Sequence, residues 1–280
     1  MVLCFVLGND CAVAISEHIS GSVEEFSKLM NAKAQQLGLI HTHFVTPHGL
    51  DDPNHYTTAY ELALLTNYAL KNEKFREIVG TKTTTISIGD YSRTISNTNE
   101  LLSNFEGVYG VKTGFTFNAG RCLVSSCNRN GMDIIVVVLG ADTKNFRTSD
   151  SIKVINYIYD NFKYIDISDF INENFSEYQK YYEKNVHLYK TTTVPQIQLS
   201  TLDNYCFPLK ENTSNLLTTK FYTLNNLSSS LNANDKIGSM NIYYNNKILC
   251  SINITLKNNL EQNSWQYYFF KILKEFNYNF

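Results

Sequence analysis

The 280-residue sequence has no excess of positive charge: 24 lysine and arginine residues face 26 aspartate and glutamate residues, for a net charge of −2. Chains that bind nucleic acid usually carry a basic patch, so we expect no nucleic-acid partner. Hydrophobic residues make up 43% of the chain and charged residues 18%, which is typical of a folded protein and excludes global disorder. A chain of this length can hold two domains.

The six cysteines form no Cys-x-x-Cys pair and none of the spacings typical of zinc sites. We therefore expect free thiols, no metal and no other cofactor. We also expect no secretory leader in residues 1–7, because this stretch is apolar but short and has no basic flank. If Met1 is the true start, we expect no evident export route for this chain.

A lysine, a hydroxyl and a glycine follow a short apolar run at Lys112, Thr113 and Gly114. An ammonium supplies charge, a hydroxyl donates a hydrogen bond, and a glycine lets another backbone approach closely. These are the properties with which a strand can receive a peptide carboxylate. Downstream, an Asn-Gly pair at residues 130–131 separates two apolar runs, which is a strong hairpin signal. We therefore expect Lys112 on a strand beside an antiparallel hairpin.

Helical periodicity surrounds this strand. We expect a helix capped by Asn9 or Asp10, and a second helix that starts with a capping box at Ser22 and Glu25. Two further helices are predicted over residues 59–71 and 148–162, with a turn-rich loop over residues 46–59 before the first of them.

Beyond residue 163 the pattern changes to short alternating runs that are typical of strands. An Asn-Asn pair at residues 245–246 predicts a tight hairpin between the last two of them. The predicted strands cover residues 186–189, 197–199, 220–222, 239–244 and 248–254.

Together these motifs resemble the D-alanyl-D-alanine carboxypeptidases, which are serine peptidases and low-molecular-mass penicillin-binding proteins. The matching segments occur in the family's order and spacing: residues 8–14, 17–22, 49–52, 55–56, 97–99, 112–114, 119–120 and 123–125. The resemblance implies an α+β fold, with an antiparallel sheet and helices over residues 1–162. It also implies a small all-β domain over residues 163–262 and an amphipathic helix over residues 263–280.

The resemblance further implies a serine-type carboxypeptidase of peptidoglycan maturation, extracytoplasmic and membrane-associated. Its substrate would be a stem peptide ending in D-Ala-D-Ala, and β-lactams would bind the intact family. Asn9 would be a catalytic residue that orients the substrate, and the backbone N–H of Phe115 would form half of the oxyanion hole. The implied substrate-binding residues are Lys112, Thr113, Gly114, Phe115 and Thr116, with Lys112 and Thr113 holding the terminal carboxylate.

Two features depart from the family pattern. The family's nucleophile belongs to a Ser-x-x-Lys element upstream of Gly8, yet no serine of this chain has a lysine three residues later. Leu7 stands where the family has a serine, and leucine cannot take part in proton transfer. We therefore expect an N-terminally truncated member that is inactive as given. The alternative is a natural non-catalytic relative that binds stem peptides or a partner through the same groove.

A metal-dependent hydrolase is a third alternative, since residues of metal-binding types cluster in the turn-rich loop. Their spacing matches no helix-borne histidine pair, so a polar loop satisfied by local hydrogen bonds is the favoured interpretation. The residues concerned are His41, His43, His48, Asp51, Asp52 and His55.

Aromatic and aliphatic side chains recur at helical spacing from Trp265 to Phe280, while lysines lie off that stripe. Such a helix can lie in a membrane interface, and it is too short to span a bilayer. We expect peripheral membrane contact through residues 265–280; the alternative is packing on the β domain.

Overall fold

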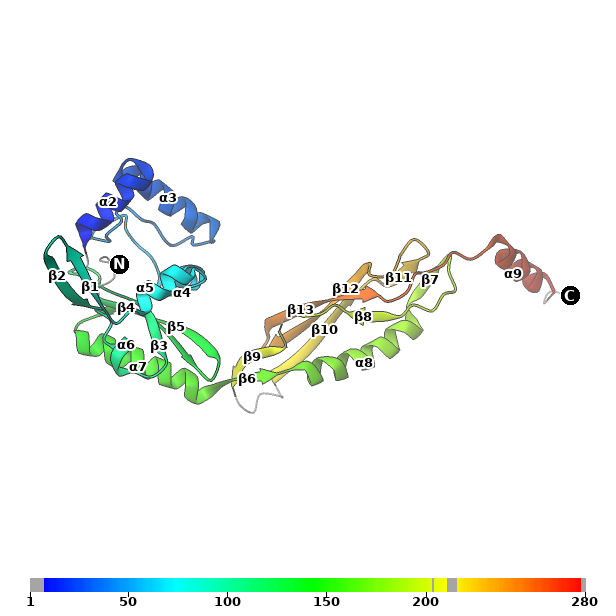
Figure 1. Cartoon of the computed structure of the whole chain (residues 1–280). Coiled ribbons are helices and arrows are strands. Elements are labelled where there is room, and N and C mark those ends of the chain that lie inside the picture. Colours follow the sequence, from blue (N-terminus) through cyan, green and yellow to red (C-terminus); the bar gives the residue numbers. More distant parts are fainter. Residues whose placement is uncertain (1–7, 203, 211–215, 278–280) are drawn as a thin grey trace. The chain divides into compact units, whose positions relative to one another are not determined.

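The computed structural model describes residues 8–202, 204–210 and 216–277 (Figure 1). It divides into two compact units, Met1–Asn161 and Phe162–Phe280. Leu7 and the last residues of the predicted terminal helix, 278–280, lie outside the described residues.

A three-stranded antiparallel sheet in the order β3-β4-β5 forms the centre of the first unit. A separate hairpin pairs β1 with β2. The elements are α2 (Asn9–Ser20), α3 (Val23–Gln36), α4 (Ala59–Ala69), α5 (Glu73–Gly80), β1 (Thr83–Ile88), β2 (Tyr91–Ser96), α6 (Leu101–Asn104), β3 (Val108–Thr116), β4 (Gly120–Arg129), β5 (Met132–Ala141) and α7 (Lys144–Asn161).

Successive side chains of a strand point to opposite faces of its sheet, so apolar residues at consecutive positions of the central strand need cover on both faces. On one face Leu123 packs in a core with Ile155 of α7 and residues of α6. On the other, Val124 packs in a core with Val79 of α5 and Leu70. Figure 1 shows α6 and α7 on one side of β3–β5, and α4 and α5 on the other. The sheet that carries Lys112 is therefore buried on both faces.

Local signals set several boundaries as predicted. Asn130 and Gly131 both adopt positive φ (52° and 80°) in the β4–β5 turn, which confirms the hairpin. Ser22 caps α3 by accepting a hydrogen bond from the N–H of Glu25 at 3.2 Å. The predicted cap of α2 is wrong. Gly8 is its N-cap, with no side-chain bond, because residues 9 and 10 already belong to the first helical turn.

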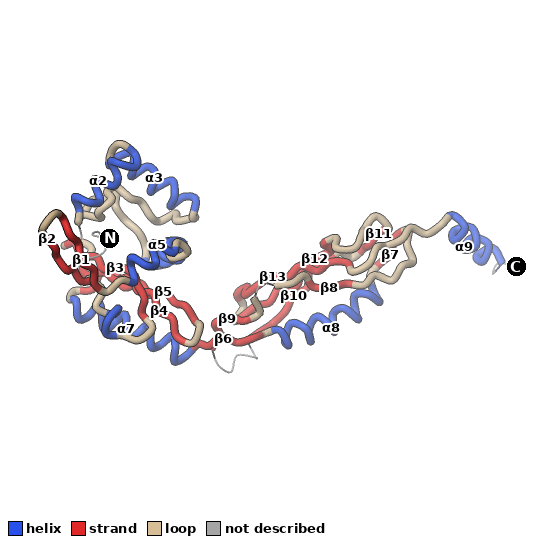
Figure 2. The backbone as a smooth tube through the Cα atoms, in the orientation of Figure 1, coloured by secondary structure: helices blue, strands red, loops and turns tan. Residues whose placement is uncertain are grey.

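The second unit contains a mixed set of strands and one long helix beside them (Figure 2). Its main sheet has the order β10-β12-β13-β8, and β6 pairs with β9 and β7 with β11. The elements are β6 (Phe162–Asp166), α8 (Ser168–Asn185), β7 (His187–Tyr189), β8 (Ile197–Leu199), β9 (Cys206–Lys210), β10 (Leu217–Thr223), β11 (Asn226–Ser228), β12 (Lys236–Tyr244), β13 (Lys247–Leu256) and α9 (Trp265–Asn277).

The predicted strands of this unit are confirmed, and the β domain also contains a helix that was not predicted, α8, which runs for 18 residues against the sheet. Its buried face consists of Ile171, Phe175 and Tyr182, which join the core around Met240 and Ile242 of β12. This face offers about one large residue per turn among asparagines and tyrosines. The apolar stripe of α8 is therefore too narrow to predict the helix from the sequence, although its few large residues are buried in the core.

The terminal helix α9 presents its side chains to solvent. Trp265 is 73% exposed, Phe270 64% and Leu273 42%. The segment before it is anchored, since Leu260 is buried and the N–H of Asn263 donates to the carbonyl oxygen of Lys190 at 3.0 Å. The described part of α9 therefore does not pack on the β sheet. Among the described residues, no helix is both long enough and apolar enough to cross a bilayer.

Candidate functional site

A cavity of about 590 Å³ in the first unit brings together the predicted site residues that the structure describes. Helix α2 contributes Asn9, and β3 contributes a continuous run along one wall. Another wall comes from the loop between α3 and α4, at Phe44, residues 46–50 and His55. The predicted residues in its lining are Asn9, Lys112, Thr113, Gly114, Phe115 and Thr116.

Strand β3 is an edge strand in the described sheet, because β4 is its only sheet neighbour there. An edge strand presents backbone N–H and C=O groups with which an extended peptide can pair. Gly114 lies opposite Cys122 in the β3–β4 register, and Cys122 also lines the cavity. Since Gly114 has no side chain, the cavity floor beside Cys122 stays open.

Of the predicted carboxylate-binding pair, Lys112 is partly buried and Thr113 is buried. The ammonium of Lys112 donates to the carbonyl oxygen of Thr113 at 2.6 Å. Thr113 is 6% exposed, and its hydroxyl lies 2.6 Å from that of Thr98. If Thr98 donates in that pair, the proton of Thr113 remains able to donate to a ligand.

Residues 97–99 hold β3 in position through hydrogen bonds. The amide of Asn99 donates to the carbonyl oxygen of Gly110 at 2.8 Å, and Asn99 itself is 2% exposed. Asn97 donates to the carbonyl oxygen of Val79 at 3.2 Å, which ties the same segment to α5. With the Thr98 contact to Thr113, these bonds fix the strand that carries Lys112.

Two arginines near this strand were not predicted. The guanidinium of Arg121 lies 3.9 Å from the ring centroid of Phe115, a cation–π contact that holds the exposed ring in place. Arg147 of α7 is 3% exposed, and its Nε has no hydrogen-bond partner among the described residues. Burial lowers the pKa of Arg147, while nearby Glu100 opposes this shift. A buried cation beside β4 places positive charge behind the strand pair.

The loop wall is held by side chains of the two flanking helices. Asn31 of α3 bonds both the N–H and the C=O of Phe44, each at 2.8 Å. Glu61 of α4 is 4% exposed and accepts hydrogen bonds from the N–H of His41 at 2.9 Å and from the hydroxyl of Thr42. Burial opposes the ionisation of Glu61, but these bonds outweigh it and lower its pKa.

The metal-binding alternative finds no support, because no three His, Cys, Asp or Glu side chains in the described ranges come close enough to share an ion. The loop side chains bond to backbone instead. Nδ1 of His43 lies 2.6 Å from the carbonyl oxygen of Asn54, and Asp52 accepts from the N–H of Asn54 at 2.7 Å.

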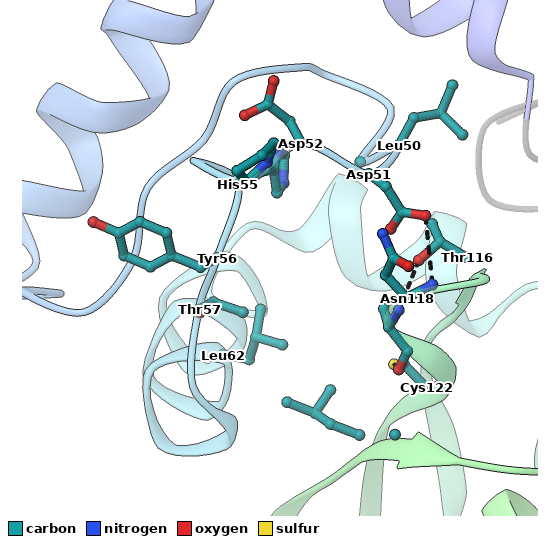
Figure 3. A pocket seen from close by; sticks show the side chains of 15 residues that line it. Leu50, Asp51, Asp52, His55, Tyr56, Thr57, Leu62, Thr116, Asn118 and Cys122 are labelled. Atoms are coloured by element: carbon teal, nitrogen blue, oxygen red, sulfur yellow. Dashed lines mark hydrogen bonds between the residues drawn. The ribbon is translucent and has the colours of Figure 1, made fainter.

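A second cavity of about 720 Å³ adjoins the first (Figure 3). The two share part of their lining, including His55, Thr116 and Cys122. Across it, Asp51 of the loop accepts a 3.5 Å bond from the N–H of Asn118 in the β3–β4 turn. The loop and the end of β3 therefore form one continuous pocketed surface.

Comparison with known families agrees with this geometry. Residues 2–143 match the model of the D-alanyl-D-alanine carboxypeptidases, peptidase family S11. The chain belongs to this family. Residues 173–262 match the C-terminal domain of penicillin-binding protein 5, which lies within the second unit. The family predicted from the sequence is thus confirmed.

Curated relatives match more than half of this chain. D-alanyl-D-alanine carboxypeptidase DacF of Bacillus subtilis is 39% identical over 163 residues, which cover 56% of this chain and 40% of that protein. DacA of Haemophilus influenzae is 38% identical over 185 residues, which cover 64% of this chain and 46% of that protein. The chain therefore spans less than half the length of these relatives.

Solved structures extend the similarity to both units. Penicillin-binding protein 5 from Haemophilus influenzae matches with a TM-score of 0.71 and 28% identity, over 93% of this chain and 73% of that one. Penicillin-binding protein D2 from Listeria monocytogenes, solved with cefotaxime bound, matches with a TM-score of 0.51 and 31% identity, over 55% and 62%.

Proposed function

We propose that the first unit forms the substrate-binding wall of a serine-type D-alanyl-D-alanine carboxypeptidase that acts in peptidoglycan maturation. One observation carries the proposal: Asn9, Lys112 and Thr113, from segments about a hundred residues apart, line a single cavity beside an edge strand. An ammonium and a hydroxyl at the edge of a strand suit the terminal carboxylate of an extended peptide.

In this proposal the stem peptide lies antiparallel along β3. Lys112 and Thr113 bind its terminal carboxylate, and the amide of Asn9 orients the peptide bond before the last residue. The N–H of Phe115 donates to the carbonyl oxygen on which negative charge develops. Arg147 of α7 adds a buried positive charge from the face of the sheet that α7 covers.

The 280 residues contain no Ser-x-x-Lys element, so we propose that this chain by itself binds the peptide without cleaving it. Removing a nucleophile from such a catalytic unit costs several orders of magnitude in rate. A non-catalytic binding role is therefore the second candidate, and both candidates use the same groove.

A fluorescent penicillin distinguishes reversible binding in the groove from covalent acylation of the chain. We expect reversible binding, seen as a rise in fluorescence anisotropy, and no covalent band after denaturing electrophoresis. A covalent band on the 280-residue chain would show that another side chain acts as nucleophile and would contradict the proposal.

We further propose that α9 contacts membranes peripherally. Its support is the exposure of large apolar side chains along the helix, from Trp265 to Leu273. Each such side chain gains about 1.5–3 kcal/mol when fully transferred from water, and an interface buries it only in part. Binding to vesicles should therefore be modest and reversible.

A further inference from the structure

His55 links the two ends of the loop that forms the groove wall. Its Nδ1 accepts hydrogen bonds from the N–H of Val45 at 3.2 Å and of Thr46 at 3.4 Å. Its ring packs edge-on against Phe44, with ring centroids 5.8 Å apart. The side chain also lines both cavities of the first unit, as Figure 3 shows for the larger one.

Residues 46–50, which His55 holds, have few other hydrogen bonds to the rest of the unit. Within this segment the bonds are local, from the N–H of Gly49 to the hydroxyl of Thr46 and from the N–H of Leu50 to His48. The hydrogen bond from the N–H of Asn118, in the β3–β4 turn, to the carboxylate of Asp51 is long at 3.5 Å. The position of residues 46–50, which line the groove together with Lys112, therefore depends on the acceptor at Nδ1.

We propose that His55 is a positioning residue that keeps the 46–50 wall closed over the groove only while its imidazole is neutral. A neutral ring has a lone pair on Nδ1 and carries its proton on Nε2. Protonation converts Nδ1 into a donor that faces two backbone donors, so both hydrogen bonds are lost. This inference rests on the proposed function, since the groove it closes is the peptide groove.

The surroundings of His55 favour the neutral ring. Burial lowers its pKa below 6.5 and outweighs the carboxylate of Asp52, which acts in the opposite direction. His43 and His48 lower it further, and Asp51 and Lys112 are the other charged groups in the linings of its cavities. Asp52, His43 and His48 thus act on the ring directly, and Asp51, Lys112 and Cys122 share its cavities.

The sign of the pH effect follows from the lowered pKa. The closed wall binds fewer protons than the open one, so it is fully stable above pH 6.5 and weakens as the pH falls below that value. With one proton involved, the equilibrium constant for opening rises at most tenfold per pH unit.

Two substitutions test the role of the acceptor. His55→Asn places an amide oxygen near the position of Nδ1 and does not titrate, whereas His55→Gln places its polar group near that of Nε2. We expect the amide-exchange protection factors of Val45 and Thr46, measured by NMR, to fall several-fold between pH 7.5 and 5.0 in the original chain. The Asn variant should stay protected throughout, and the Gln variant should be unprotected throughout.

The proposal would be overturned if the protection factors of Val45 and Thr46 did not change with pH in the original chain, or if they were equal in the two variants. Affinity for an acetylated peptide ending in D-Ala-D-Ala gives the second readout, and it should decline below pH 6.5 in the original chain but not in the Asn variant. If no variant binds the peptide at any pH while protection behaves as expected, the proposed function fails and the role of His55 in the loop stands. If protection changes and affinity does not, His55 does not position the groove.

Discussion

Substituting Gly114 by alanine should change peptide binding in the groove without destabilising the fold. A Cβ at Gly114 would lie 3.7 Å from the Cβ of Cys122, which is an ordinary van der Waals contact. The φ of Gly114 is not in the left-handed region, so alanine fits the backbone. Gly→Ala at a compatible position stabilises a protein by about 0.4–1 kcal/mol, which for a unit of this size raises the unfolding temperature by roughly 1–4 °C.

The same methyl group stands where the peptide would approach β3. Inserting a methyl into a close-packed contact costs about 1–3 kcal/mol, which is a loss of roughly 5- to 150-fold in affinity. Gly114→Ala should therefore be slightly more stable than the original chain and bind a D-Ala-D-Ala peptide more weakly. Thermal unfolding followed by circular dichroism and an NMR titration measure the two quantities.

Gly107→Ala is the matched control, since Gly107 directly precedes the same strand. Its φ is +83°, and a Cβ there would collide with the carbonyl oxygen of Asn128, whose N–H is bonded to Gly107. This variant should lose stability by several kilocalories per mole, about 1–3 from the collision and 1–2 from the backbone conformation. The reasoning is refuted if Gly114→Ala unfolds as Gly107→Ala does, or if it binds the peptide as tightly as the original chain.

Three further outcomes are expected. The pKa of Glu61 is lowered because hydrogen bonds outweigh burial, so the stabilisation that Glu61 contributes is present above pH 4.5 and is lost as the pH falls. Glu61→Gln should therefore reduce the loss of unfolding free energy below pH 4.5. An unchanged loss in the variant would contradict this. Ile155→Ala should cost about 2–5 kcal/mol in chemical denaturation of the first unit, because Ile155 is 0% exposed, whereas a cost below 1 kcal/mol would show that the α7 interface is loose. Deleting residues 265–280 should abolish vesicle co-sedimentation and leave the unfolding temperature unchanged; the opposite pair of results would make α9 a structural cap.

The features predicted well from the sequence are those that short-range chemistry controls. The positive φ angles at residues 130–131 and 245–246 require small or amide residues, so these hairpins could be predicted. The N-cap at Ser22 is equally local, although the carboxylate of Glu25 pairs with Lys28 instead of completing the capping box. The family resemblance placed Asn9 and Lys112 in one site, and they line one cavity.

The features missed depend on tertiary packing. Helix α8 has a narrow buried face, which the sheet core supports and the sequence period does not reveal. Arg147 gains its role from burial, and Glu61 from a backbone group far along the chain, and nothing in their sequence neighbourhoods marks them. His55 belongs to a segment that matches the family, but its hydrogen bonds with the N–H groups of Val45 and Thr46 were not predicted. Predicting them requires knowing which loop lies opposite which strand.

The central claim is that the groove beside β3 binds the terminal carboxylate of a D-Ala-D-Ala peptide. The direct test is a titration of the isotope-labelled chain with an acetylated peptide ending in D-Ala-D-Ala, its C-terminal amide, and the Lys112→Gln variant as a control. We predict saturable shifts of the backbone signals from Lys112 to Thr116 with the free acid, and a loss of at least tenfold in affinity for the amide and for the variant. Equal affinity for acid and amide, or shifts confined to other segments, would contradict the account.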